Sequence, residues 1–172
     1  MASIHLIDLT PDTRERVEAF ILAAKAQGLD VSVVSTLRTC ADQGTSTGPV
    51  DIGGGMTAKR APGCRSWHVW GRAVDLALRV PSPERYKLLG ELGESYGLVW
   101  GGRFRTNPDP VHFQYAPGLD IAKLCPDPTD CTGALKAAGT VAPPESSRIL
   151  SAFAFVIGGT VGWIAWRRIR RI

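Results

Sequence analysis

The sequence predicts a small domain of the mixed α+β class followed by one C-terminal transmembrane helix. Three observations lead to this prediction: two segments with helical periodicity, several short β-branched or alternating segments, and one long uncharged apolar run near the end of the chain. The 172 residues give room for one ordinary domain and an appendage, and too little for two full-size domains.

The first predicted helix runs from about Pro11 to Gln27, with Thr10 as its N-cap and Gly28 as its stop. Its apolar residues recur at helical spacing, as Val17, Phe20, Ile21 and Ala24. The second predicted helix opens at Ser82-Pro83-Glu84. One of its sides carries Tyr86, Leu89, Leu92 and Tyr96.

Four short segments have the composition of strands, and they lie between and after the two predicted helices. They are residues 31–35, 73–78, 98–100 and 111–115. We expect 73–78 and 98–100 to form a strand pair. Residues 40–65, rich in Gly, Thr, Ser and Pro, are predicted to be one long loop, and Leu119–Leu124 a short helical turn that closes the domain.

The charge distribution argues against a nucleic-acid partner. The formal net charge is +4, and all of it comes from four arginines in the last six residues, so residues 1–166 are neutral overall. A basic patch over the body, which nucleic-acid binding requires, is therefore not expected.

The segment Ile149–Trp166 holds eighteen consecutive residues without a charge, which is about 27 Å of helix at about 1.5 Å per residue. Arginines flank it at both ends, and its tryptophans suit a membrane interface. We predict a transmembrane helix within 149–172, its basic end cytoplasmic, joined to the domain by a linker over 125–148. A buried core helix is the alternative. The spacing of Ala154, Gly158 and Gly162 suggests helix–helix association in the membrane.

The four cysteines, Cys40, Cys64, Cys125 and Cys131, contain no Cys-x-x-Cys pair, which excludes a zinc ribbon. Two disulfides and four buried thiols both fit the sequence. A bridge between Cys40 and Cys64 would pin the long loop, and would suit an extracytoplasmic location.

Two histidines and two aspartates form the candidate site. His68 and Asp75 are seven residues apart, and Gly71 between them can supply the bend that lets both side chains converge. Asp109 and His112 lie three residues apart further on. Two imidazoles and one carboxylate, with a fourth position left for water, are the ligands of a catalytic zinc site, and a further carboxylate would take a proton from that water.

The alternative is that these histidines and aspartates are ordinary surface or helix-capping residues, because short His and Asp motifs often have no metal-binding role. His5 has no neighbour of a suitable type and is expected to be structural or exposed.

Four segments of the chain, in order, resemble the M15 peptidase family over roughly residues 10–116. Residues 66–75 match the zinc motif Ser-x-His-x-x-Gly-x-Ala-x-Asp, and Asp109-x-x-His112-Phe113 resembles the motif with the catalytic base and last ligand. The other two are Ser35-Thr36-Leu37-Arg38-Thr39 with Asp42-Gln43, and Tyr96-Gly97-Leu98-Val99-Trp100-Gly101-Gly102. Leu37 and Asp42 replace the family's usual Tyr and Glu, and residues 44–64 are atypical.

The resemblance implies a small antiparallel sheet with flanking helices around one Zn²⁺. His68, Asp75 and His112 would bind the metal, and Asp109 would carry the proton from the attacking water to the leaving amine. Arg38 would act on the substrate carbonyl or carboxylate. The substrate-binding residues would be Arg38, Ser66 and Gln43.

The function implied is hydrolysis of an amide bond in peptidoglycan stem peptides. An aspartate at position 109 is more similar to the endolysin branch, which favours an L-alanyl-D-glutamate endopeptidase. The alternatives are a D-alanyl-D-alanine carboxypeptidase, a zinc-stabilised cell-wall-binding domain without turnover, and a membrane-disrupting cationic tail. A membrane-anchored enzyme that faces the cell wall fits these expectations. It could be a bacteriolytic phage lysin or a virion component, or a bacterial envelope enzyme inserted through its tail.

Overall fold

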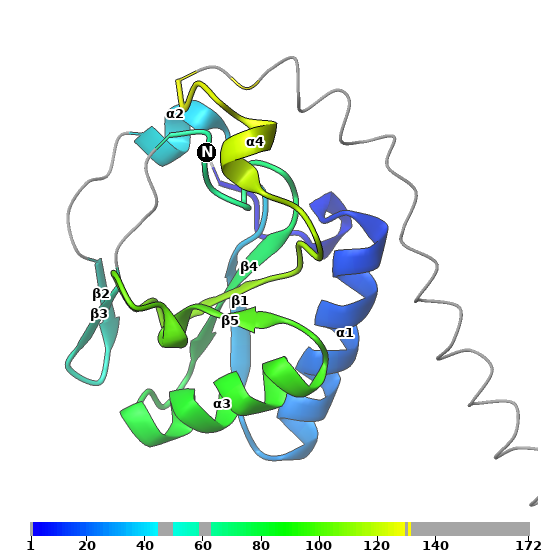
Figure 1. Ribbon diagram of the computed structural model, residues 1–172. Coiled ribbons are helices and arrows are strands. Elements are labelled where there is room, and N and C mark those ends of the chain that lie inside the picture. Colours follow the sequence, from blue (N-terminus) through cyan, green and yellow to red (C-terminus); the bar gives the residue numbers. More distant parts are fainter. Residues whose placement is uncertain (1, 45–49, 59–62, 130, 132–172) are drawn as a thin grey trace, which may run out of the picture. The chain divides into compact units, whose positions relative to one another are not determined.

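A four-stranded antiparallel sheet forms the centre of the structure, a computed structural model that describes residues 2–44, 50–58, 63–129 and 131 (Figure 1). Its strand order is β1 (Val31–Ser35), β4 (Ala73–Leu78), β6 (His112–Gln114) and β5 (Val99–Trp100). All neighbouring pairs are antiparallel. The described residues fall within one compact unit, Met1–Thr140. The α+β class with an antiparallel sheet is therefore confirmed.

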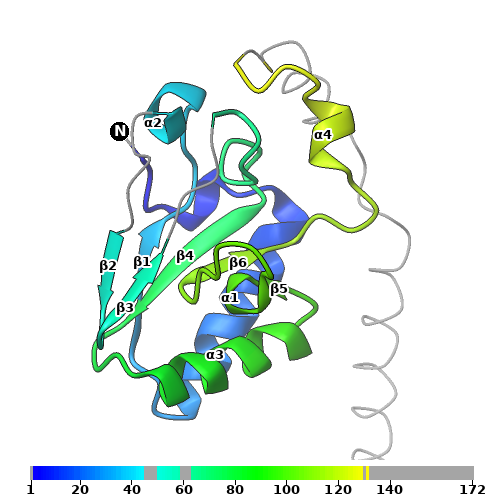
Figure 2. The same cartoon turned by 60° about the vertical axis from the view of Figure 1, so that its left-hand side comes forward.

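Two helices cover one face of this sheet: α1 (Pro11–Ala26) and α3 (Pro83–Ser95) (Figure 2). Apolar side chains of both helices meet the central strands in one core. Its fully buried members are Val17, Phe20, Ala24, Val74, Leu76, Tyr86, Leu89 and Phe113. The opposite face of the central strands is thus left for polar side chains.

The predicted helices are confirmed within one or two residues at their ends. Ser82 caps α3, since its Oγ accepts a hydrogen bond of 3.2 Å from the Arg85 N–H. Thr10 occupies the N-cap position of α1 but makes no capping hydrogen bond. Its Oγ1 lies 2.8 Å from the Thr13 Oγ1 instead.

The expected pairing of 73–78 with 98–100 is wrong, because β6 lies between β4 and β5. Ala73 of β4 and Val99 of β5 both face Gln114 of β6, from opposite sides. Chain order cannot reveal this arrangement. The strand that fills the gap comes last and belongs to the motif that carries His112.

The prediction of one long loop over 40–65 is also wrong in part. The segment contains a short helix, α2 (Cys40–Gly44), and a hairpin of β2 (Val50–Gly53) and β3 (Met56–Ala58). The hairpin turns at Gly53–Gly55, where all three residues have positive φ, which glycine adopts without steric cost.

The four cysteines form two disulfides. The alternative of four buried thiols, which the sequence left open, is thereby excluded. Cys40 is bonded to Cys64 with the Cα atoms 4.6 Å apart, and Cys125 is bonded to Cys131 at 5.3 Å. Both are part of a second apolar cluster around Trp70.

Residues at the start of the predicted linker contact the domain, just after α4 (Ile121–Leu124). The Cys64 N–H donates to the Pro128 carbonyl at 2.9 Å, and the Arg65 Nη2 donates to the Pro126 carbonyl at 2.6 Å. Two 3₁₀ turns, η1 (Leu6–Asp8) and η2 (Gly101–Arg103), complete the described elements.

Among the described residues, no helix is long and apolar enough to cross a membrane. The predicted span Ile149–Trp166, its small-residue stripe and the linker beyond residue 131 lie outside the described residues. They stay predictions.

The Cys40–Cys64 bond closes a separation of 24 residues and joins the segment after Arg38 to the segment before His68. Replacing both cysteines by serine should lower the free energy of unfolding by about 3 kcal/mol, because the unfolded chain regains the freedom of that loop. Urea unfolding of the full chain, compared with the Cys125→Ser/Cys131→Ser variant, checks this. The shorter separation of 6 residues predicts the smaller loss. A larger loss for the short loop would contradict the expectation.

Candidate metal centre

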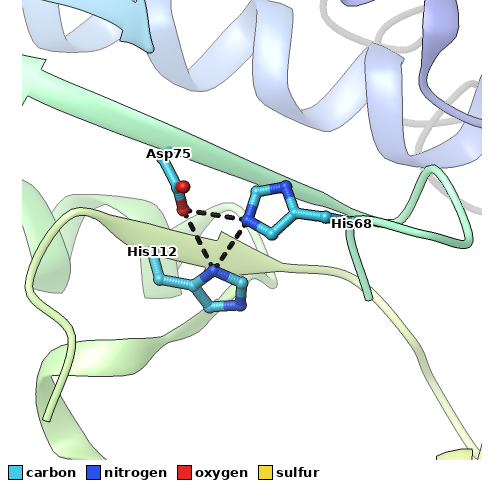
Figure 3. Close-up of side chains that lie close together, drawn as sticks. All are labelled: His68, Asp75 and His112. Atoms are coloured by element: carbon cyan, nitrogen blue, oxygen red, sulfur yellow. Dashed lines mark hydrogen bonds and ion pairs between the residues drawn. The ribbon is translucent and has the colours of Figure 1, made fainter. Parts of the chain in front are cut away.

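Three buried side chains bring their ligating atoms together on the polar face of the sheet (Figure 3). The His68 Nε2 lies 3.0 Å from the Asp75 Oδ1 and 3.2 Å from the His112 Nδ1, and the His112 Nδ1 lies 3.1 Å from the same carboxylate oxygen. These separations are close to the edge of a tetrahedral zinc site, which is about 3.3 Å for metal–ligand bonds of about 2.0–2.1 Å. The three predicted ligands are therefore neighbours in space.

Strand register places two of the three. Asp75 of β4 and His112 of β6 are direct partners in the antiparallel ladder, so their side chains stand side by side on one face. The residues next to them alternate to the other face. Val74, Leu76 and Phe113 are all fully buried in the core beneath α1 and α3.

His68 reaches the same point from a tight turn just before β4. The Trp67 carbonyl accepts hydrogen bonds from the backbone N–H groups of Trp70 and Arg72, which folds the chain back on itself. Gly71 makes this possible with a φ of 63°. A Cβ at Gly71 would lie 2.9 Å from the Asp8 carbonyl oxygen. The predicted bend at Gly71 is thus present.

Each histidine uses its outer nitrogen for a hydrogen bond to protein. The His68 Nδ1–H donates to the Thr36 carbonyl at 2.6 Å, and the His112 Nε2–H donates to the Gln114 Oε1 at 3.1 Å. When both imidazoles are neutral, their inner nitrogens carry lone pairs, which converge on a carboxylate oxygen. Three such acceptors at 3.0–3.2 Å repel one another unless a positive charge lies between them, so the donor set suits a divalent metal.

The two histidines differ in their electrostatics in the metal-free protein. Burial lowers the pKa of His68, which favours the neutral imidazole that a metal needs. Burial also opposes the charged form of His112, but the hydrogen bond and charge of Asp75 outweigh it and raise the pKa of His112. Burial tends to raise the pKa of Asp75, but the neighbouring histidines outweigh it and hold this pKa well below the usual value.

Arg38 lies beside the candidate metal ligands and forms an ion pair with Asp75. Its Nη2 donates to the Asp75 Oδ2, the oxygen that faces away from the histidines. Its Nε donates to the Ser35 Oγ at 2.8 Å and its Nη1 to the Gln43 Oε1 at 3.2 Å. Three of the five guanidinium donors are therefore used within the protein.

The structure thus brings Arg38 and Gln43 to the site, and their substrate contacts stay predictions. Ser66 is buried at the start of the turn that carries His68, where its carbonyl accepts from the Val69 N–H. His5 is exposed, as predicted.

Asp109 lies close enough to His112 and Asp75 to interact with their charges, but it is not one of the three candidate metal ligands. Its backbone is fixed by two hydrogen bonds, from its own N–H to the Gly101 carbonyl at 2.9 Å and from the His112 N–H to its carbonyl at 3.1 Å. Within the described part of the chain, its Oδ1 is buried without a hydrogen-bond partner. Burial raises the pKa of Asp109 to about 6. A carboxylate of this kind is suited to accept a proton near neutral pH.

Sequence reasoning missed two hydrogen-bond acceptors of the site, the Thr36 carbonyl and the Gln114 side chain. Gln114 lies two residues after His112 on a strand, so the same face was predictable from spacing. The Thr36 carbonyl is a backbone group, and no residue type signals its role.

Replacing Gly71 by alanine should lower the free energy of unfolding, because an L-residue is strained at this φ and the new Cβ would collide with the Asp8 carbonyl. Gly118→Ala is a matched control, with a φ of 68° and no atom within 4 Å of the new Cβ. We expect the Gly71 variant to lose at least about 1 kcal/mol more than the control in urea unfolding. Equal losses would show that the Asp8 contact is unimportant.

The raised pKa of Asp109 predicts a pH-dependent stability of the metal-free protein. Its folded pKa of about 6 exceeds the ordinary aspartate value of 3.8, so the folded state binds more protons between those pH values. The contribution of Asp109 to the free energy of unfolding is complete below about pH 4 and is lost as pH rises through about 6. Asp109→Asn should remove it and make the variant the more stable protein at pH 7, by at most about 3 kcal/mol.

Denaturant unfolding between pH 4 and 7 measures this difference, and the same substitution at the exposed Asp30 is the control. A stability difference between the Asp109→Asn variant and the parent that does not change with pH would contradict the assignment.

Comparison with known proteins supports the resemblance on which the site was predicted. Residues 59–115 match a family model described as D-alanyl-D-alanine carboxypeptidase, one of the M15 peptidases. This segment contains all three predicted metal ligands and Asp109. A search among curated proteins found no match.

Three solved structures have distant likeness to this chain. The L-Ala D-Glu endopeptidase ChiX of Serratia marcescens is 23% identical with a TM-score of 0.45, over 64% of this chain and 83% of that chain. A Zn(II) complex of a mutant D,D-pentapeptidase VanY from a VanB-type resistance cassette is 18% identical with a TM-score of 0.47, over 74% and 83%. The LD-carboxypeptidase LdcB is 15% identical with a TM-score of 0.49, over 74% and 68%.

The family match covers the segment where the structure places the converging histidines and carboxylate. Residues 59–115, which carry these side chains, are similar to the M15 peptidase family.

Proposed function

We propose that this protein hydrolyses an amide bond in peptidoglycan stem peptides, between L-alanine and D-glutamate. The observation that carries the proposal is the buried, unpartnered Oδ1 of Asp109 beside three converging metal-ligand atoms. A buried acceptor without a partner costs free energy. During the reaction, the proton of an attacking water would give this atom a partner.

His68, Asp75 and His112 would hold Zn²⁺ through the Nε2, Oδ1 and Nδ1 atoms that already converge. When bound, Zn²⁺ acts as a Lewis acid on the substrate carbonyl and makes water a stronger acid. Asp109 accepts the proton of the attacking water and donates it to the leaving amine. Arg38, whose charge lies beside the site, would stabilise the negative charge that develops on the carbonyl oxygen.

A D-alanyl-D-alanine carboxypeptidase is the second candidate, since that activity is the description of the matching family model. The endopeptidase takes precedence because aspartate at position 109 is more similar to the endolysin branch of the family. The two activities differ in the bond cut, and the same zinc chemistry serves both.

We also propose that the segment Ile149–Trp166 anchors the protein in a membrane with its arginine-rich end cytoplasmic and the peptidase domain facing the cell wall. Its hydropathy, length and flanking charges support this placement. A lysin of a phage or a wall-degrading virion component would have this organisation. Recovery of the full chain in the membrane fraction after alkaline washing tests the anchor, and release by the wash would exclude it.

The full chain in mild detergent should release new chain ends from purified peptidoglycan, and a chelator should abolish the release. Mass spectrometry identifies the ends. L-Ala and D-Glu ends would establish the endopeptidase, whereas free D-Ala would establish the carboxypeptidase. No cleavage by a folded, zinc-loaded chain would leave a cell-wall-binding domain.

Asp109→Asn should lower the rate by about 10²–10⁴-fold, the usual contribution of a general base, while the zinc content stays unchanged. Asp30→Asn is the matched control for the rate. A variant that kept its activity would show that another group accepts the proton.

A further inference from the structure

Gln114 provides the hydrogen bond that fixes the ring of His112. The Gln114 Oε1 accepts from the His112 Nε2–H at 3.1 Å. The other two metal-ligand residues also have outer partners. His68 donates to the Thr36 carbonyl, and Asp75 accepts from Arg38. Gln114 is the one of these partners that lies on the same strand as the ligand it contacts.

The backbone around Gln114 is held on both sides. β6 lies between β4 and β5, and Gln114 faces Ala73 on one side and Val99 on the other. Phe113 points to the opposite face, where it is fully buried with its ring 4.9 Å from that of Phe20. The side chains at 112 and 114 therefore share one face of a strand that cannot easily shift.

The tautomer of His112 decides whether it can bind a metal. With the proton on Nε2, the Nδ1 lone pair points at the group formed with His68 and Asp75. With the proton on Nδ1, that N–H would donate to the Asp75 Oδ1, which lies 3.1 Å away, and the ligand position would be blocked. The half-buried Gln114 Oε1 on the outer side favours the first state.

We propose that Gln114 is a positioning residue that holds His112 in the Nε2–H tautomer and so makes its Nδ1 a metal ligand. The inference rests on the proposed metal-binding role of His112. For His68 the corresponding acceptor is a backbone carbonyl, which no substitution at that position removes. The tautomer of His112 depends on a side chain and can be tested directly.

Three variants of the full chain separate a hydrogen-bond role from a packing role. Gln114→Met has a similar volume and no acceptor, whereas Gln114→Glu restores an acceptor. Gln27→Met, at an exposed position, is the matched control. Zinc affinity by chelator competition should fall about 10–100-fold in Gln114→Met and stay at the parent level or higher in Gln114→Glu and Gln27→Met. A packing role would make Gln114→Glu at least as damaging as Gln114→Met.

Nitrogen-15 shifts of the zinc-loaded parent protein give a second readout. They should report a protonated Nε2 and a metal-bound Nδ1 for His112. This measurement tests the tautomer of His112 even if a variant fails to fold. A protonated Nδ1, or equal zinc affinity in the parent and Gln114→Met, would overturn the inference and leave the proposed function standing. A folded parent chain that bound no zinc would instead overturn the proposed function, and the inference with it.

Discussion

The pairing of Asp75 with His112 across β4 and β6 is the constraint on which the site depends. Because side chains alternate along a strand, this register puts both residues on the polar face and puts Val74, Leu76 and Phe113 in the core. A slip by one residue would exchange the two sets. The hydrophobic core beneath α1 and α3 therefore fixes the positions of these two candidate metal ligands.

A second layer of hydrogen bonds orients what the sheet brings together. The Thr36 carbonyl, Gln114 and Arg38 each hold one ligand from outside, so that lone pairs point inward. The Cys40–Cys64 disulfide ties the segment that carries Arg38 and Gln43 to the segment that leads to His68. The site is thus supported from three separate parts of the chain, joined by a covalent bond and by sheet register.

Asp109 differs from Asp75 although both are buried carboxylates near the same histidines. Arg38 and the histidines hold the charged form of Asp75, whereas burial dominates at Asp109 and raises its pKa to about 6. One carboxylate is therefore suited to bind a cation and the other to exchange a proton. This division of roles follows from hydrogen-bond partners, since the two residues are of the same type.

The sequence alone determined the elements that local patterns encode: both long helices, the start of the second helix at Ser82-Pro83, the four sheet strands and the bend at Gly71. It also indicated the ligand types and Asp109, through motif spacing and family resemblance. Only the tertiary structure decided the order β1-β4-β6-β5, the disulfide partners and the partners of His68 and His112. These depend on contacts between residues far apart in the chain, such as Thr36 and His68, and a backbone carbonyl leaves no trace in residue type. Helical periodicity is read within one turn, whereas strand order and ring tautomers are set by which distant segments pack together.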